Sequence, residues 1–263
     1  QWLSKEEAPR TLGQIISARS AATLFVLGGL YVGLQFFDPN YPLIYLLGGG
    51  VTVALGIFCW LAFPHFKDKV AQRNELFLRK PYWLYYTLTF LSGARRQRFT
   101  VFAAFLLVEK FGFPLDKMVL LVLANSALNI YVAPKIGALI SRIGERHALT
   151  LEYSALIIIF LLYAVVENGN VAIVLYILDH IFFSMAIAIK TYFQKIADPA
   201  DMSATAGISF TINHIAAVVL PAALGFVWIF NHSAVFVIGA AIAVLSLIVA
   251  QLIPDAPSDG NEI

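Results

Sequence analysis

The stretch Ser92-Gly93-Ala94-Arg95-Arg96-Gln97-Arg98-Phe99 places three guanidinium groups in the middle of an otherwise apolar run, residues 81–108. At the centre of a membrane-spanning helix each arginine opposes insertion by roughly 2.5–3.5 kcal/mol, whereas each Leu, Val or Phe favours it by only about 0.3–0.6 kcal/mol. Either the arginines face a cavity or a partner inside the membrane, or this run does not cross the membrane. The number of membrane spans depends on which alternative holds.

The composition identifies the class of protein. Hydrophobic residues make up 60% of the 263-residue chain and charged residues 13%, with a mean hydropathy of +0.79. A soluble domain carries about 25% charged residues. The single cysteine, Cys59, excludes an intramolecular disulfide. The sequence therefore predicts an integral membrane protein surrounded by a lipid bilayer.

Eight apolar segments are long enough to cross the bilayer, because a helix of about 20 residues spans its hydrocarbon core. They are residues 20–37, 43–63, 81–108, 116–140, 148–166, 171–189, 204–230 and 234–253. We expect an all-α integral membrane bundle of about eight transmembrane helices, with two helices in residues 1–64 and six in residues 81–253. Residues 65–80 are predicted to form a cytoplasmic basic linker, and residues 254–263 a cytoplasmic tail.

The distribution of lysine and arginine supports this count. When residue 1 is placed in the cytoplasm, most of the 18 basic residues fall in cytoplasmic segments, and the outer loops hold only Lys110 and Lys117. Splitting the span 81–108 at its arginines would invert every later loop and move its basic residues outside. The sequence therefore places the three arginines inside the membrane, with residue 1 and the C-terminus in the cytoplasm.

The end of the fourth predicted span carries the motif Gly137-Ala138-Leu139-Ile140-Ser141-Arg142-Ile143-Gly144-Glu145-Arg146. It resembles the cytoplasmic-loop motif of the major facilitator superfamily of transporters, Gly-x-x-x-Asp-Arg-x-Gly-Arg-Arg. The matching positions are Gly137, Arg142, Gly144 and Arg146, whereas Ser141 replaces the Asp and Glu145 replaces an Arg. We expect the first glycine to allow close helix packing and the second a tight turn. Glu145 is a candidate partner for either arginine of the motif.

The order of the segments also resembles this family. Two spans, a basic linker and six spans are similar to helices five to twelve of its twelve-helix members, whose two six-helix halves are joined by such a linker. The six-helix part would then be a complete major-facilitator half. The resemblance implies that N-terminal helices are missing from this portion, or that a partner subunit takes their place.

The resemblance also implies where a substrate would bind. In this family substrates bind near the membrane midplane, and the third and sixth spans of this chain correspond to two helices that line the cavity. Arg95 and Arg98 lie about 60° apart on one helix face, and a guanidinium fork binds carboxylate or phosphate, so they predict a small anionic substrate. The alternative is structural: the arginines hold the bundle together through ion pairs with Asp179 or Glu152.

The sixth span carries the adjacent pair Asp179 and His180 near its centre. An intramembrane Asp beside a His can take up and release protons, so this pair is the candidate for proton coupling, and protons would be a partner in transport. Tyr176 lies on the same side of the helix and is a candidate substrate contact. A structural bridge between Asp179 and an arginine is the alternative.

Three amides complete the predicted substrate-binding set. Asn125 and Asn129 share one face of the fourth span, and Asn213 lies centrally in the seventh. Such amides either bind a substrate or join neighbouring helices through hydrogen bonds. Tyr85, by contrast, belongs to an aromatic group that we expect at the membrane interface.

The leading hypothesis is a secondary active transporter that moves a small anionic solute by alternating access, coupled to protons. One alternative is an exporter of drugs or neutral metabolites with structural arginines. Another is a non-transporting membrane scaffold or sensor built on a partial transporter fold. The sequence shows no metal-spaced His/Cys set, phosphate-binding glycine loop or nucleophile elbow, so we expect no enzymatic activity, cofactor, metal or nucleic-acid partner. We expect a multi-pass protein of the plasma (inner) membrane.

Overall fold

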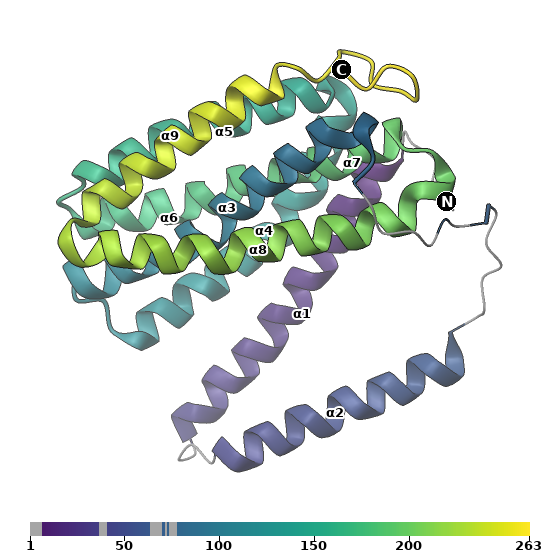
Figure 1. The fold of residues 1–263 in the computed structure, drawn as a ribbon. Coiled ribbons are helices and arrows are strands. Elements are labelled where there is room, and N and C mark those ends of the chain that lie inside the picture. Colours follow the sequence, from purple (N-terminus) through teal and green to yellow (C-terminus); the bar gives the residue numbers. More distant parts are fainter. Residues whose placement is uncertain (1–6, 37–40, 64–69, 72, 74–77) are drawn as a thin grey trace.

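The computed structural model describes residues 7–36, 41–63, 70, 71, 73 and 78–263, except for the side chains at positions 30, 34, 35, 41, 96–100 and 115. In these residues the regular structure is helical (Figure 1), apart from one isolated bridge near the C-terminus. The predicted all-α class is therefore confirmed.

The helices follow the predicted spans closely. They are α1 (Ala8–Phe36), α2 (Tyr41–Ala62), the short η1 (Lys80–Tyr82), α3 (Trp83–Phe105), the π-helical η2 (Leu106–Lys110), α4 (Leu115–Ile143), α5 (Glu145–Val165), α6 (Gly169–Phe183), η3 (Ser184–Ala186), α7 (Ile187–Ile196), η4 (Pro199–Asp201), α8 (Met202–Phe230) and α9 (His232–Ala250). Length and apolar composition alone select 7 membrane-spanning candidates in the described residues, with α6, η3 and α7 counted together. The arginines keep α3 out of that set, and α3 is the eighth long helix.

Two helices extend beyond the predicted spans. Helix α1 begins at Ala8 and has Pro9 in its first turn, where the missing N–H of proline costs no hydrogen bond. Helix α7 continues to Ile196, although the predicted span ended before Lys190. One face of α7 packs into the bundle, and its lysines lie outside that face. This packing stabilises the helix beyond position 189, where the apolar run ends.

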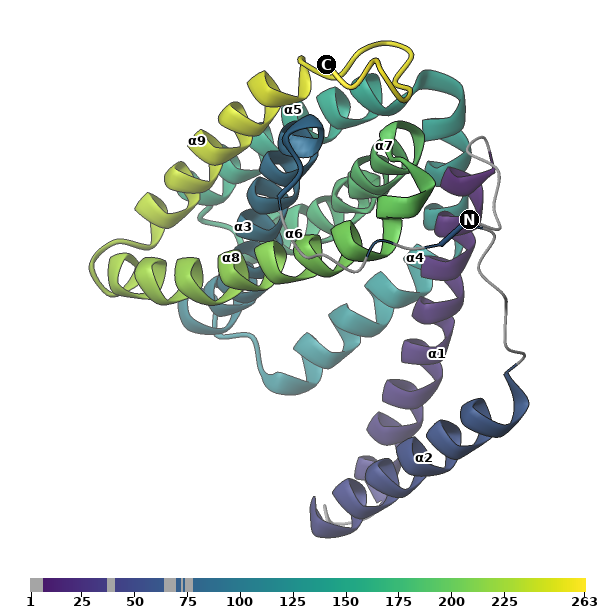
Figure 2. The same cartoon turned by 45° about the vertical axis from the view of Figure 1, so that its right-hand side comes forward.

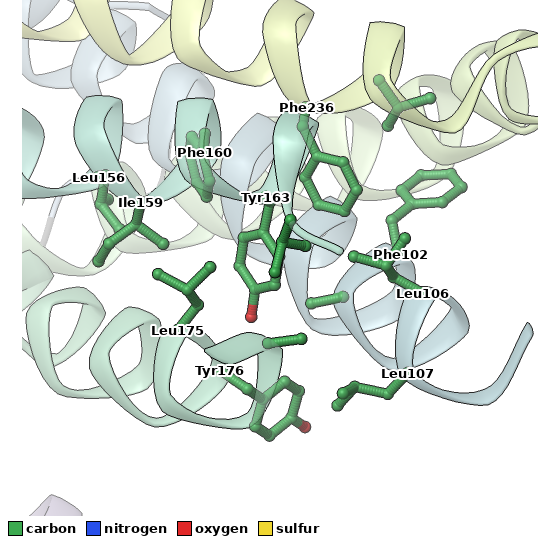
Figure 3. Packing of buried hydrophobic residues seen from close by; sticks show 14 of the residues in the cluster. Phe102, Leu106, Leu107, Leu156, Ile159, Phe160, Tyr163, Leu175, Tyr176 and Phe236 are labelled. Carbon is green, nitrogen blue, oxygen red and sulfur yellow. The ribbon is translucent and has the colours of Figure 1, made fainter. Parts of the chain in front are cut away.

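The core of the bundle consists of two hydrophobic clusters. The first cluster joins the end of α3 to α5, α6 and α9; in it the rings of Tyr163 and Phe236 stack with centroids 5.0 Å apart, and Leu175 lies beside them (Figure 3). The second cluster joins the beginning of α3 to the beginning of α5 and to α7, around Leu88 and Tyr192. Along α3, α4, α5 and the α6–α7 helix, buried polar residues separate the two clusters. We call them the polar layer: Arg95, Asn125, Glu152 and Asp179.

Close contacts between helix backbones depend on small residues. Helix α1 crosses α4 at two points, where Gly13 meets the backbone of Ala133 and Gly137 meets that of Pro9. A Cβ atom at either glycine would collide with the opposite helix. Ser17 strengthens the crossing by donating a hydrogen bond to the carbonyl oxygen of Ile130 at 2.6 Å.

The remaining helices are arranged around this crossing. Helix α5 lies beside α9, and α3 lies beside α8 (Figure 1). Helix α2 and the far end of α1 stand apart from the bundle in both views (Figure 2), and α2 is exposed along nearly its whole length.

The linker before α3 is attached to the connection between α7 and α8. Arg73 lies 2.9 Å from the carboxylate of Asp201 and 3.2 Å from that of Asp198, and Arg79 lies 3.0 Å from Asp201. The hydrogen bond to Asp201 and the charges of both carboxylates raise the pKa of Arg73 above its ordinary value. These contacts connect the beginning of the six-helix part to the loop before α8.

Candidate functional site

A cavity of about 550 Å³ lies between α1, α4 and the α6–α7 helix. Its polar lining residues are Arg19, Ser20, Thr23, Asn129, Asp179, His180, Ser184 and Lys190. We call it the first cavity. Three of the residues predicted from sequence lie there together: Asn129, Asp179 and His180.

The wall of the first cavity contains a 3₁₀ turn within a continuous membrane helix. Between α6 and α7 the chain forms the 3₁₀ turn Ser184–Ala186. The hydroxyl of Ser184 lies 3.1 Å from Asn129 Oδ1 and 3.0 Å from the carbonyl oxygen of His180. Asn129 therefore joins α4 to the 3₁₀ turn as well as lining the cavity. Helix α3, in contrast, is α-helical through Gly93.

The hydrogen bond of His180 indicates which of its ring nitrogens carries the hydrogen. Its Nδ1 lies 2.8 Å from the carbonyl oxygen of Tyr176, which can only accept, so Nδ1 carries the hydrogen and Nε2 is the nitrogen that takes up a proton. The same Nδ1 lies 3.9 Å from Asp179 Oδ2. Tyr176 itself is buried, with its ring 4.4 Å from the imidazole. It supports the His180 ring and is absent from the lining of the first cavity.

Arg95 lies in the bundle interior with none of its surface exposed. Its Nη2 is 3.2 Å from Glu152 Oε1, and its guanidinium carbon is 4.2 Å from the centre of the Tyr153 ring. This is the ion pair that the structural alternative anticipated. The side chain of Arg98 lies outside the described residues, so both substrate-binding arginines stay predictions.

The polar layer contains more carboxyl groups than bases. Arg95 pairs with Glu152, and Glu152 Oε2 and Asp179 Oδ1 are buried without a hydrogen-bond partner among the described residues. Both polar atoms of the Asn125 amide lack a partner there too. Because an unpaired buried charge is costly, a proton on one carboxyl group would neutralise the layer. Asp179 is the member of the layer that borders the first cavity.

A second cavity, of about 430 Å³, lies between α3, α7 and α8. Its aromatic lining residues are Tyr85, Phe183, Phe193 and Phe210, and its polar lining residues are Thr89, Ser92, Lys190, Gln194, Ser209 and Asn213. Asn213 also lies against Gly93, where α8 approaches α3 so closely that a Cβ atom would not fit. Among the groups searched in the described residues, no cluster of His, Cys, Asp and Glu has the arrangement of a metal site.

One known protein family matches most of the chain. A family model described as Major Facilitator Superfamily matches residues 1–221. The chain belongs to the major facilitator superfamily. It is therefore a multi-pass integral membrane protein of a transporter family, with a lipid bilayer around it and a small molecule as its substrate. A search of curated proteins finds no match to the chain.

Most residues of the major facilitator motif lie where their residue types predict. Gly137 lies at the α1–α4 crossing, and Gly144 adopts a φ of 81° in the turn between α4 and α5, so both glycine predictions are confirmed. Arg146 binds the tail residue Asp255 at 3.2 Å, and Arg142 is exposed. Glu145, however, binds neither arginine, because Lys195 of α7 lies 2.8 Å from its buried carboxylate.

Sequence reasoning missed three lining residues of this major facilitator chain. Arg19 and Lys190 were placed in polar segments outside the spans, and Tyr85 at the membrane interface. A signal for Lys190 existed: it lies seven residues after Phe183, on the same face of a helix that continues past position 189. No comparable signal distinguishes Tyr85 from an interfacial tyrosine.

Proposed function

We propose that the protein is a secondary transporter that moves a small anionic solute by alternating access, with Asp179 and His180 coupling transport to protons. The observation that carries this proposal is the first cavity, which combines a 3₁₀ turn in a membrane helix, an Asp–His pair and two basic residues. The correspondence with helices five to twelve and the cytoplasmic position of residue 1 belong to the same proposal.

The charge of the first cavity supports an anionic solute. Arg19 comes from α1 and Lys190 from α7, so cations line the cavity from two separate helices. Basic residues within membrane helices are costly unless they face water, an anion or a partner. A carboxylate or phosphate between the two helices can accept charge-assisted hydrogen bonds from both basic side chains. Movement of α1 relative to α7 would then open and close the site.

The position of Asp179 supports proton coupling. Asp179 belongs to the polar layer and also lines the first cavity, so its charge state affects both the Arg95–Glu152 pair and a bound anion. When Asp179 is protonated, the cavity becomes more positive and favours the anion. When it loses the proton, the carboxylate repels the anion. Anion and proton would therefore bind together.

Transport by the purified protein in vesicles tests this proposal. Asp179→Asn is expected to abolish the dependence of anion uptake on a pH gradient, because the amide cannot titrate. His180→Gln is expected to reduce that dependence at least severalfold. His214→Gln is the matched control: its Nδ1 lies 2.7 Å from the carbonyl oxygen four residues earlier, as in His180, but it lines neither cavity. Unchanged pH dependence in Asp179→Asn would refute the proton role.

One observation favours the alternative of an exporter for neutral solutes. Arg95 is fully buried and paired with Glu152, which is the structural role that this alternative assigns to the arginines. The two functions differ in what Lys190→Gln does. Loss of flux for anions indicates the anion transporter, whereas undiminished flux of a neutral solute indicates the exporter. A protein that moves neither kind of solute would be the non-transporting scaffold.

A further inference from the structure

The residues after α9 form an ordered loop that returns to the bundle. Ile253 has no exposed surface, and paired backbone hydrogen bonds between Ser258 and Asn261 close a tight turn in which Gly260 has a φ of 83°. This tail, residues 254–263, crosses the end of the bundle where α5 begins and α7 ends (Figure 1, Figure 2). The tail is therefore part of the folded structure.

Two contacts attach the tail to two different helices. In α7, Tyr192 has no exposed surface, and its hydroxyl donates a hydrogen bond of 2.6 Å to the carbonyl oxygen of Glu262. At the beginning of α5, Arg146 lies 3.2 Å from the carboxylate of Asp255. We expect the hydrogen bond to hold more firmly, because water screens the exposed ion pair. The tail thus connects α7 to α5.

A direct contact joins the same two helices. Lys195, the last residue but one of α7, lies 2.8 Å from the carboxylate of Glu145, which is buried at the first position of α5. The end of α7 is therefore held against α5 in two ways, by the tail and by this ion pair.

The other end of α7 adjoins the 3₁₀ turn Ser184–Ala186. A 3₁₀ stretch inside a helix has poorer hydrogen-bond geometry than the α-helix around it and often marks a hinge. Beyond this turn, α7 contributes Ile187 to the first cavity, Phe193 to the second and Lys190 to both. A swing of α7 about the 3₁₀ turn would therefore move the walls of both cavities, and the contacts at its far end oppose that swing.

We propose that the tail is a latch on α7. While Glu262 is bound to Tyr192, the end of α7 stays against α5 and the second cavity keeps its observed form. When the tail detaches, α7 swings about the 3₁₀ turn and opens the second cavity. This inference depends neither on the solute nor on proton coupling, so it goes beyond the proposed function.

Hydrogen exchange in the detergent-solubilised full chain tests the latch without a solute. Tyr192→Phe removes the hydroxyl that binds Glu262 and keeps the ring. Because one hydrogen bond is lost, backbone amides in residues 187–196 and 254–263 are expected to exchange about fivefold faster, as measured by mass spectrometry.

The labelling rate of a cysteine in the second cavity tests whether the latch controls access. Ser209 lines that cavity and is only 7% exposed, so Ser209→Cys, made in a Cys59→Ser background, places a thiol in its wall. Adding Tyr192→Phe is expected to raise the rate of reaction with a maleimide about fivefold, because α7 leaves the cavity wall more often.

Two matched variants separate release of the latch from a general loosening of the bundle. Tyr163→Phe is the control for Tyr192→Phe, because Tyr163 is only 1% exposed and its hydroxyl has no hydrogen-bond partner among the described residues. It is expected to leave exchange and labelling unchanged. Ser246→Cys is the control for Ser209→Cys: Ser246 belongs to α9, has no exposed surface and lines neither cavity, so it is expected to stay unlabelled.

The outcomes separate this inference from the proposed function. Faster exchange in both α7 and the tail, with faster labelling at position 209 alone, supports the latch. Faster exchange in the tail alone, with α7 and the labelling rate unchanged, would overturn it, because the tail would then not hold α7. Equal gains in labelling at positions 209 and 246 would overturn it as well. In each case the dependence of uptake on Asp179 is a separate measurement, so the proton-coupled transporter stands or falls by its own test.

Discussion

Arg95 shows what a single charged side chain requires inside a membrane bundle. It has no exposed surface, and its charge is compensated by Glu152 and by the face of the Tyr153 ring. The cost of moving an arginine out of water is high, so it is tolerated only with such partners. Gly93, two residues before Arg95, lies where α8 packs closely against α3. Arg95 thus connects α3 to α5.

Removing the partner of Arg95 tests this role. Glu152→Ala would leave a buried guanidinium without its carboxylate, so we expect the free energy of unfolding to fall by about 3–5 kcal/mol. Denaturant unfolding of the detergent-solubilised protein measures the loss. Arg146→Ala is the comparison, because its pair with Asp255 is largely exposed and contributes less than about 1 kcal/mol. Losses of the same small size in both variants would contradict the structural role.

At the scale of elements, the α1–α4 crossing holds one wall of the first cavity. Helix α1 supplies Arg19 to that wall and α4 supplies Asn129. Their separation depends on two glycines, because backbone meets backbone at Gly13 and at Gly137. Helices in membranes associate through such small residues, since apolar side chains gain little by leaving lipid. The first glycine of the loop motif therefore also positions the cavity.

A larger side chain at the crossing would move α1 away from α4. For Gly137→Leu we expect a loss of about 1–3 kcal/mol in stability, the usual cost of overpacking, together with weaker anion binding as Arg19 moves. Thermal unfolding and anion uptake into vesicles measure the two effects. Gly28→Leu provides the control, because no atom lies within 4 Å of a Cβ at that position in α1. A Gly137→Leu protein as stable as this control would show that the crossing is not tightly packed.

At the scale of the whole molecule, the charge distribution predicts how the chain is oriented. The linker before α3 and the segment between α4 and α5 carry lysines and arginines that we place in the cytoplasm, whereas the loop between α5 and α6 is predicted to lie outside. In the structure Ser258 and Glu167 are both exposed, so each can react with a water-soluble reagent. The protein's one cysteine, Cys59, is exposed as well and has to be replaced first.

Labelling of single cysteines tests the orientation. In a Cys59→Ser background, Glu167→Cys is expected to react with a membrane-impermeant maleimide added to intact cells, and Ser258→Cys only after the membrane is opened. The positive-inside rule is the reason, because the basic segments border the side that holds the tail. The reverse pattern would refute the orientation. Labelling of both positions in intact cells would refute the number of spans between them.

Much of the fold is predictable from local sequence, whereas the arrangement of side chains around the two cavities is not. Seven of the long helices follow from apolar length, and α3 from the placement of basic residues in the loops. Gly144 follows from the need for a positive φ in a tight turn. The burial of Tyr85 and the reach of α7 to Lys190 depend on contacts with distant helices. Hydropathy reports the preference of a segment for lipid. It does not report which face meets another helix.

The sequence by itself determined that this is an all-α membrane transporter of the major facilitator superfamily, because apolar length, charge placement and a spaced glycine motif are local properties. Only the tertiary structure decided that Arg95 pairs with Glu152, that Asp179 and His180 border a cavity with Arg19 and Lys190, and that the helix tightens into a 3₁₀ turn at Ser184–Ala186. These depend on which faces of separate helices pack together. In a bundle, that choice follows from side chains far apart in the chain.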